Sequence, residues 1–454
     1  MGTFFEQMIV RDFIRPKSRE KVMAMSERKK RWFSDISKEE NVGGKDFATP
    51  ADIHSPGGWA RTRTGAQRYI SGTSGNGVYG QWINTPGTIS GGILFSDREI
   101  AASEGMTDNA FASFYEARKH RIAGLFERFA GIVSRLCLGP PGGTLAQVAS
   151  ISSGVITLNS NYSERIADLQ KGDILVYSQN DGSTSTDTTL GSGSRGYVIA
   201  VNLSGDSPTV TVSASDGGSA GSPTGWEAVQ TGYIFREEEF QGGLDQGPNV
   251  DVETHKLVID SFQAWVPSAV KTNTFKNVDR SQTSALCGVI RTSSDIVGND
   301  ISECLEDLAE EGQSRHGWDL ESQRFYMHPR RVKQLSRNLE ARKIRTESVT
   351  EARGGESVAS WGYSKMKVHS ADATYIVVPD AHCDQTVAVA MDPDDWVFRS
   401  EGGFPGLMDR DSNQILRQAT EDNLELRAKS YPSFMLKSGR NINRSGRTAL
   451  PAES

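Results

Sequence analysis

The most regular pattern of hydrophobic and polar positions lies in residues 108–138. Apolar side chains recur there every three or four residues, a spacing that gathers them on one face of an α-helix. Thr107 or Asp108 is placed to cap the helix start, and the Gly-Pro-Pro run at 139–141 ends it. At 1.5 Å per residue this helix is roughly 45 Å long, which suits a stiff strut. The apolar positions are Phe111, Phe114, Tyr115, Ile122, Leu125, Phe126, Phe129, Ile132, Val133 and Leu136. The other side carries Arg118, Lys119, Arg121, Arg128 and Arg135, which we interpret as a solvated or inter-subunit face.

The pattern changes at about residue 144 to short alternating segments rich in Gly, Ser and Thr. These segments are SGVITLNS, GDILVYSQ, GYVIAVNL, PTVTVSAS and TGYIFRE. Turn residues separate them at the spacing of a small barrel, apart from one long loop at about 180–194. We therefore predict a self-contained β-domain over 144–236, which serves either as a surface module or as a spacer.

After residue 240 the pattern is mixed. Helical spacing covers 253–266, 299–312 and 329–341, with Asn299 as the expected cap of the second helix and Gly312 as its end. The third helix begins with proline at its first position, where a missing N–H costs nothing. Strands are predicted at ATYIVVPD, TVAVAMDP and DWVFRS, and in the alternating stretch NLELRAKSYPSFMLKS.

Residues 55–95 form a long excursion with two strand-like arms, RTRTGAQRYIS and GVYGQWINT. A hairpin of that length cannot bury both faces by itself, so we expect it to lie on another subunit. Gly75, Gly77 and Gly80 match the G-x-G-x-x-G pattern of dinucleotide-binding loops. That loop needs a hydrophobic strand before it and a helix after it, and the flanking sequence offers neither. The expected subunit-contact residues are Trp59, Arg61, Arg63, Arg68, Tyr69, Tyr79 and Trp82.

Composition narrows the function further. The chain has 454 residues, a net charge of −7 and 36% hydrophobic residues, so it can build a large core but is not a generic nucleic-acid binder. No run of eighteen apolar residues occurs, and the four cysteines are far apart, as expected for reduced, buried thiols.

Residues 11–31 are strongly basic and form either an arm that contacts phosphate or an acidic partner, or a solvated amphipathic helix. The basic residues are Arg11, Arg15, Lys17, Arg19, Lys21, Arg28, Lys29, Lys30 and Arg31.

No catalytic, cofactor or metal constellation emerges. The G-x-S-x-G match at 217–221 follows a strand but leads into a small-residue loop, whereas a nucleophile elbow needs a helix there. His316 and His328 are too far apart in sequence for a helical metal motif, and the acidic turn at 392–395 lacks the alternating ligands of a calcium loop. We therefore expect a protein that is not an enzyme.

The order of these elements resembles the major capsid proteins of tailed bacteriophages, the HK97-fold family. A basic arm leads to a long Arg/aromatic hairpin and then to one long helix. An α/β region follows with FYMHPRRVKQLSRNLEARK, YIVVPD and VAVAMDPDDW, and the chain closes with ATEDNLELRAKSYPSFMLKSGRN. The resemblance covers nearly the whole chain except 144–236.

The resemblance implies an α+β, HK97-like capsid fold with an inserted all-β domain. The implied parts are an N-terminal arm at 1–54, an extended loop at 55–97, a peripheral domain with the spine helix at 98–143, the inserted β-domain at 144–236, a peripheral continuation at 237–266, an axial domain at 267–380, and closing peripheral strands with the C-terminal tail at 381–454.

The implied function is that of a structural subunit of an icosahedral phage head. It would assemble with itself into pentamers and hexamers in the host bacterial cytoplasm and enclose double-stranded DNA, which it would contact only non-specifically. A separate scaffolding protein, a portal and a decoration protein are the other expected partners, with no membrane and no cofactor. Some members of the family join subunits through an extended-loop lysine, but between Asp46 and His120 this chain has only Lys119. We therefore expect no covalent cross-links.

Two alternatives remain at this point. An encapsulin-like compartment shell shares the implied fold. A virion surface protein could instead bind glycan through the β-domain, where Trp226, Tyr197 and Tyr177 would either stack on sugar or fill the core and turns.

Overall fold

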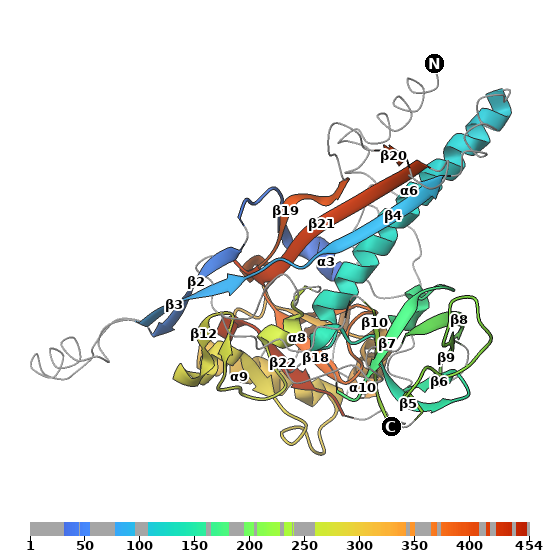
Figure 1. Cartoon of the computed structure of the whole chain (residues 1–454). Coiled ribbons are helices and arrows are strands. Elements are labelled where there is room, and N and C mark those ends of the chain that lie inside the picture. Colours follow the sequence, from blue (N-terminus) through green and yellow to red (C-terminus); the bar gives the residue numbers. More distant parts are fainter. Residues whose placement is uncertain are drawn as a thin grey trace, which may run out of the picture.

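The structure is a computed structural model of the chain, with elements labelled as in Figure 1. The residues it describes are 31–44, 46–54, 78–95, 108–159, 165–180, 195–203, 207–227, 231–237, 239, 259–341, 346–349, 365–369, 374–407, 415–417, 424–437 and 442–451. No helix in these ranges is both long and apolar enough to cross a membrane.

A long helix and a sheet of long strands form the upper part of the molecule (Figure 1). Helix α6 spans Asp108–Leu138, the bounds that the hydrophobic pattern predicts. It runs beside the antiparallel strands β4 (Ile89–Phe95) and β21 (Leu424–Leu436). Gly91 permits the close approach, because a Cβ there would stand 3.0 Å from Leu125 Cδ1 of the helix. The sheet is completed by β1 (Ser37–Glu39), β19 (Trp396–Leu407) and β20 (Ile415–Arg417).

A closed barrel follows α6 in the chain and has its own hydrophobic core. Five of its strands coincide with segments that the alternating pattern predicts, and β5 is the strand that the pattern misses. Around the barrel the order is β10 (Gly232–Arg236), β5 (Ala146–Ser152), β6 (Val155–Leu158), β9 (Thr209–Ser213), β8 (Gly196–Asn202) and β7 (Ile174–Ser178).

A mixed sheet with helices packed on it forms the lower part of the molecule. Helix α10 (Pro329–Ala341) has the predicted bounds. Helix α9 (Ile301–His316) differs from the prediction at both ends, because Asp300 rather than Asn299 is the cap and the helix continues through Gly312 to a left-handed Gly317. The sheet order is β13 (Val289–Arg291), β22 (Gly446–Ala449), β18 (Val387–Met391), β14 (Arg324–Met327), β17 (Thr374–Pro379), β16 (Lys365–His369) and β15 (Thr346–Val349).

This sheet corrects the predicted boundary at residue 380. The prediction placed all of 381–454 with the peripheral strands, but β18 and β22 pair with β14 and β13 in the mixed sheet. Only β19, β20 and β21 of that segment join the long sheet beside α6. Alternating apolar strands look alike in sequence whichever sheet they enter, so the boundary implied by the family resemblance could not be checked against the strand pattern.

The helix predicted over 253–266 is also shorter in the described residues. Helix α8 covers only Phe262–Trp265, because the Ser261 hydroxyl accepts the Ala264 N–H as an N-cap and Ser261 itself is extended. Residues 251–258 lie outside the described part of the chain.

Candidate subunit-contact surfaces

A two-stranded arm leads away from the body of the protein (Figure 1). It consists of β2 (Phe47–His54) paired antiparallel with β3 (Val78–Asn84), in a register that runs from Phe47 opposite Asn84 to His54 opposite Val78. The sequence predicted that the partner of 77–85 would be 61–71. In the described residues β3 pairs with β2, a strand that the sequence analysis does not predict. Residues 61–71 lie outside the described residues, so their pairing remains a prediction.

The base of the arm is fixed to the body by buried contacts. Trp82 is only 2% exposed, and its indole meets the rings of Trp265 and Phe275 at centroid distances of 5.3 and 6.1 Å. The Asn84 side-chain amide donates to Ser433 Oγ at 2.7 Å on β21. Thr49 donates to the carbonyl of Leu436 on the same strand. The arm therefore leaves the core from a defined position.

These contacts change the role expected for Trp82, whose side chain lies in the core of its own chain rather than on a surface offered to a neighbour. Gly80 of the G-x-G-x-x-G match lies in β3, so a strand stands where a cofactor loop needs a helix start. Tyr79 lies in β3 opposite Asp52, and its side chain is not described. The other predicted contact residues, Trp59, Arg61, Arg63, Arg68 and Tyr69, lie outside the described residues and remain predictions.

A tight turn supports the arm base from below. Lys276 and Asn277 take positive φ values of 48° and 71° between β11 (Thr274–Phe275) and β12 (Val278–Asp279). The Lys276 carbonyl accepts the N–H of Ile83 at 3.0 Å. Its ammonium group forms a 2.6 Å ion pair with Asp260, and both side chains are almost fully buried. A buried ion pair costs much to break, so it holds this turn against the segment before α8, while the carbonyl bond holds it against β3.

A continuous series of aromatic contacts joins the arm base to α6. It passes from Trp82 to Trp265, from Trp265 to Trp396 at 5.9 Å, and on to Phe434, which stacks on Trp396 at 4.7 Å. Phe434 contacts Trp32 of the short helix α3 (Arg31–Asp35), whose indole N–H donates to Ser134 of α6 at 2.6 Å. Arm base, sheet and long helix therefore share one core.

The N-terminal segment enters the core at α3. Trp32 and Phe33 are both fully buried, and the following strand β1 pairs in parallel with β19. The sequence predicts a basic arm over the residues just before, whereas no sequence motif singles out these two buried aromatic residues, which attach the segment to the core. Of the predicted basic arm, Arg31 begins α3, with an undescribed side chain. The remaining members, Arg11, Arg15, Lys17, Arg19, Lys21, Arg28, Lys29 and Lys30, lie outside the described residues.

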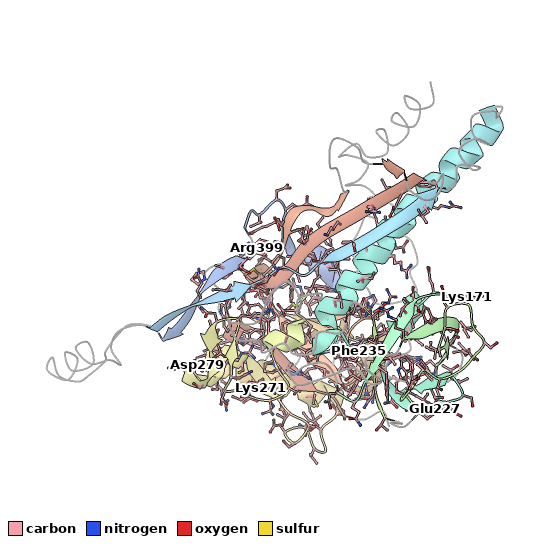
Figure 2. The ribbon with its side chains drawn as sticks, in the orientation of Figure 1. Lys171, Glu227, Phe235, Lys271, Asp279 and Arg399 are labelled. Atoms are coloured by element: carbon pink, nitrogen blue, oxygen red, sulfur yellow. The ribbon has the colours of Figure 1, made fainter. Side chains whose placement is uncertain are left out.

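The barrel is joined to α6 by ion pairs on one helix face. Arg128 donates to the Gln170 side chain at 2.9 Å and pairs with Asp173 at 3.3 Å. Arg135, seven residues further along, is fully buried and forms a 2.6 Å pair with Glu239. These two arginines of the predicted solvated or inter-subunit face are therefore engaged within their own chain. Phe235 of β10, labelled in Figure 2, lies on the side of the barrel that faces α6.

A second buried arginine joins the barrel to the lower sheet. Arg165 belongs to the short helix η3 (Arg165–Asp168) of the barrel segment and is 2% exposed. It donates to the carbonyl of His382 at 3.2 Å, in the loop between β17 and β18. The barrel is thus held at two separate places, and its orientation on the body is fixed.

A cavity of about 290 Å³ lies between the start of β4, α6 and the barrel, lined by Thr88, Ile132 and Arg236 among others. Burial, and next the charge of Arg135, lower the pKa of Arg236. Two carboxylates at the cavity already have arginine partners. Asp173 pairs with Arg128 and with Arg236, and Glu237 pairs with Arg195. The cavity is therefore part of the junction between the barrel and α6.

The other sequence motifs are structural as well. Ser219 of the G-x-S-x-G match lies in a loop after β9 rather than between a strand and a helix. The acidic turn at 392–395 is held by Arg444, which contacts Asp392 and Asp395. Within the described ranges, no group of three or more His, Cys, Asp or Glu side chains is placed to hold a metal ion. Tyr177 and Trp226, two of the three aromatic residues considered for glycan binding, are fully buried in the barrel core.

Comparison with solved structures finds phage capsids. The capsid asymmetric unit of cyanophage A-1(L) is 9% identical, with 91% of this chain and 89% of that chain covered and a TM-score of 0.47. The procapsid of satellite phage P4 including its size determination (Sid) protein is 7% identical, with 98% and 96% covered and a TM-score of 0.38. The capsid of Ralstonia phage GP4 is 9% identical, with 92% and 88% covered and a TM-score of 0.36. No protein-family model and no curated protein matches the chain. Over more than nine-tenths of its length, the chain is similar to proteins of phage capsids.

Proposed function

We propose that this protein is the major structural subunit of a phage head. It assembles with itself into pentamers and hexamers, which form an icosahedral shell around packaged double-stranded DNA. The observation that carries the proposal is the anchored arm, in which β2 and β3 start from the buried Trp82 and lead away from the body (Figure 1). An arm on a fixed base is useful to a protein that must reach a second subunit in a defined direction.

The rest of the architecture supports a mechanical role. Helix α6, with its 31 residues, packs on β4, which pairs with the 13-residue strand β21, and these elements share one core with the arm base. Long, continuously hydrogen-bonded elements resist bending. A shell gains its strength from many inter-subunit contacts of modest size, so each subunit must keep its shape while its arms reach neighbours.

The proposal also includes roles for segments that lie outside the described residues. Residues 55–77 continue the arm as the extended loop, whose arginines and aromatic residues contact a neighbouring subunit. The basic segment at 11–31 contacts an acidic partner during assembly, and a separate scaffolding protein guides shell size. A portal and a decoration protein complete the particle, and packaged DNA is contacted only non-specifically. Deletion of residues 1–31 is expected to give shells of irregular size, and uniform shells from this variant would remove the steering role.

Electron microscopy of the purified chain tests the proposal. The chain is expressed alone and together with its neighbouring phage genes, and particles are examined after negative staining. Closed icosahedral shells, or rings of five and six, are the expected result. Nuclease-protected DNA in particles from infected cells separates a phage head from a compartment shell loaded with protein. Monodisperse monomers under both conditions would overturn the proposal.

A further inference from the structure

Two neighbouring helices on the lower sheet carry opposite charge. Helix α9 has five acidic residues against one arginine, and α10 has four basic residues against one glutamate. Both helices pack on the same face of the sheet, because Leu305 and Leu308 of α9 and Leu335 of α10 lie in one hydrophobic core. Helix α9 packs against β13 and β22 at one edge of the sheet, and α10 packs against β17 in its other half (Figure 1). The acidic and the basic helix therefore lie toward opposite edges of one helical layer.

Some of these charges have partners within the chain. Asp307 and Glu311 of α9 pair with Arg291 of β13. Arg331 of α10 is buried and donates to the carbonyl of Gln385 at 2.7 Å. The acidic face of α9 and the basic face of α10 are each defined by three half-buried or exposed residues of like charge. These are Glu303, Glu306 and Glu310 on α9, and Arg330, Lys333 and Arg337 on α10.

The two faces have the same spacing. Each has steps of three and then four residues, which places its members on one side of a helix over a length of about 10 Å. Glu310, Lys333 and Arg337 are fully on the solvent side, and none of them forms an ion pair with another described residue. Although α9 and α10 are packed side by side, these charges are therefore not neutralised between the two helices of one chain.

We propose that the acidic face of α9 contacts the basic face of α10 on the next copy of the chain in the assembled shell. This inference rests on the proposed shell function. Two α9 faces placed against each other would bring like charges together, and so would two α10 faces, so the contact joins two different faces. A contact between different faces repeats from copy to copy and forms a ring when the rotation closes, as pentamers and hexamers require.

A second copy is the partner that matches both faces at once. An acidic protein or packaged DNA would match α10 but would be repelled by the adjacent α9, and a basic partner would meet the reverse arrangement. Copies of this chain carry both charges in the same spacing. Complementary charge determines partner and orientation more than affinity, so other contacts in the shell supply most of its strength.

Charge reversal on each helix tests the inference. The acidic-face variant is Glu310→Lys and the basic-face variant is Lys333→Glu. Lys333 is the middle member of its face, so it lies about 5.4 Å, one helical turn, from the position opposite Glu310 whichever way the two helices run. At low ionic strength, shells of each variant should dissociate several degrees below wild-type shells, because one attraction at every contact becomes a repulsion. Shells of the chain with both substitutions should regain most of the lost stability, because the reversed charges attract again.

Two controls separate this contact from other effects. The unassembled single variants should unfold at the wild-type temperature, since neither side chain pairs with another described residue of its own chain. Lys171→Glu on the barrel (Figure 2) makes the same charge change at an exposed site outside both faces and should leave shell stability unchanged. High salt should shrink the differences between the shells.

Two outcomes would overturn the inference. The first is that shells of either single variant dissociate at the wild-type temperature. If Lys333→Glu then lowers only the amount of packaged DNA, the basic face belongs to DNA. The second is that shells with both substitutions are no more stable than single-variant shells. Each result leaves the shell function intact. If the wild-type chain forms no shells, the proposed function fails first and this contact fails with it.

Discussion

The indole of Trp82 on the arm strand β3 packs edge-on against the indole of Trp265, with ring centroids 5.3 Å apart. Trp265 in turn donates its indole N–H to the carbonyl of Phe434 on β21 at 3.2 Å. The arm base is thus tied through one side chain to the strand that runs beside α6. This relationship makes Trp82 the residue on which the direction of the arm depends.

Replacement of Trp82 by alanine should therefore destabilise the arm base. Loss of a large buried side chain leaves a cavity and costs about 3–5 kcal/mol. We expect this loss in the free energy of unfolding of the unassembled chain in a denaturant titration, together with failure to form shells. Trp82→Phe keeps an aromatic ring in the same site and should cost much less. Equal losses in both variants would mean that the indole is not the anchor.

Alanine substitutions at two helical glycines, Gly312 and Gly124, should have opposite effects on stability. A Cβ on Gly312 of α9 would stand 2.2–2.6 Å from ring atoms of Trp318, whose indole is held by a 2.8 Å hydrogen bond to the Asn443 carbonyl. Gly312→Ala should destabilise by about 1–3 kcal/mol, because the rings cannot move aside. Gly124 of α6 is exposed, and a Cβ added there would meet no atom within 4 Å, so Gly124→Ala should stabilise by about 0.5–1 kcal/mol. Chemical denaturation of the two variants in parallel measures both, and a stabilising Gly312→Ala would contradict the packing described for α9.

Sequence periodicity predicted the elements whose pattern is set locally. The bounds of α6 and α10 were correct because their apolar spacing and their stop and start residues agree. The same reasoning failed for α9 at Gly312, where glycine serves the packing of Trp318 and does not end the helix. A helix-ending glycine and a glycine that admits a neighbouring ring look the same in a sequence.

The sequence did not reveal which distant segments pair with each other. The pairing of β2 with β3, and the entry of β18 and β22 into the lower sheet, depend on contacts between distant segments. The junction arginines illustrate the same limit. Arg128 and Arg135 look like surface residues on the polar side of an amphipathic helix, and only the position of the barrel makes them partners of Asp173 and Glu239.

The Arg135–Glu239 pair should behave as a buried, mutually dependent unit. Arg135→Met leaves the Glu239 carboxylate without its 2.6 Å partner in a site where it is only 12% exposed. Breaking such a pair costs about 3 kcal/mol, whereas replacing both partners with neutral groups is often nearly neutral. The double variant Arg135→Met, Glu239→Gln should therefore recover most of the lost stability. A double-mutant cycle of unfolding free energies measures this coupling, and additive losses would show that the two side chains act independently.

Glu227 should give the barrel a stability that depends on pH. Its carboxylate accepts hydrogen bonds from the Ser222 hydroxyl at 2.6 Å and from the Ser153 N–H at 2.8 Å, and these bonds lower its pKa below the ordinary 4.5. The folded state favours the ionised form, so the stabilisation is complete above pH 4.5 and is lost as the pH falls through the lowered pKa. Glu227→Gln should lower the Tm at pH 7, and the difference from wild type should shrink below pH 4.5. A Tm difference that stays constant down to pH 3 would rule out this contribution.

The shell should be held together without covalent bonds between subunits. An amide cross-link from the extended loop needs a lysine amine, and the region from 46 to 120 contains only Lys119, which lies in α6 rather than in the arm. Arginine, which is abundant in residues 55–77, stays protonated and is not a nucleophile at neutral pH. Purified shells boiled in SDS should therefore run as a single band at 49.5 kDa. The four described cysteines are free and buried, so the same pattern is expected with and without reducing agent. A ladder of linked subunits that persists under reducing conditions would show that a lysine elsewhere in the chain forms the bond.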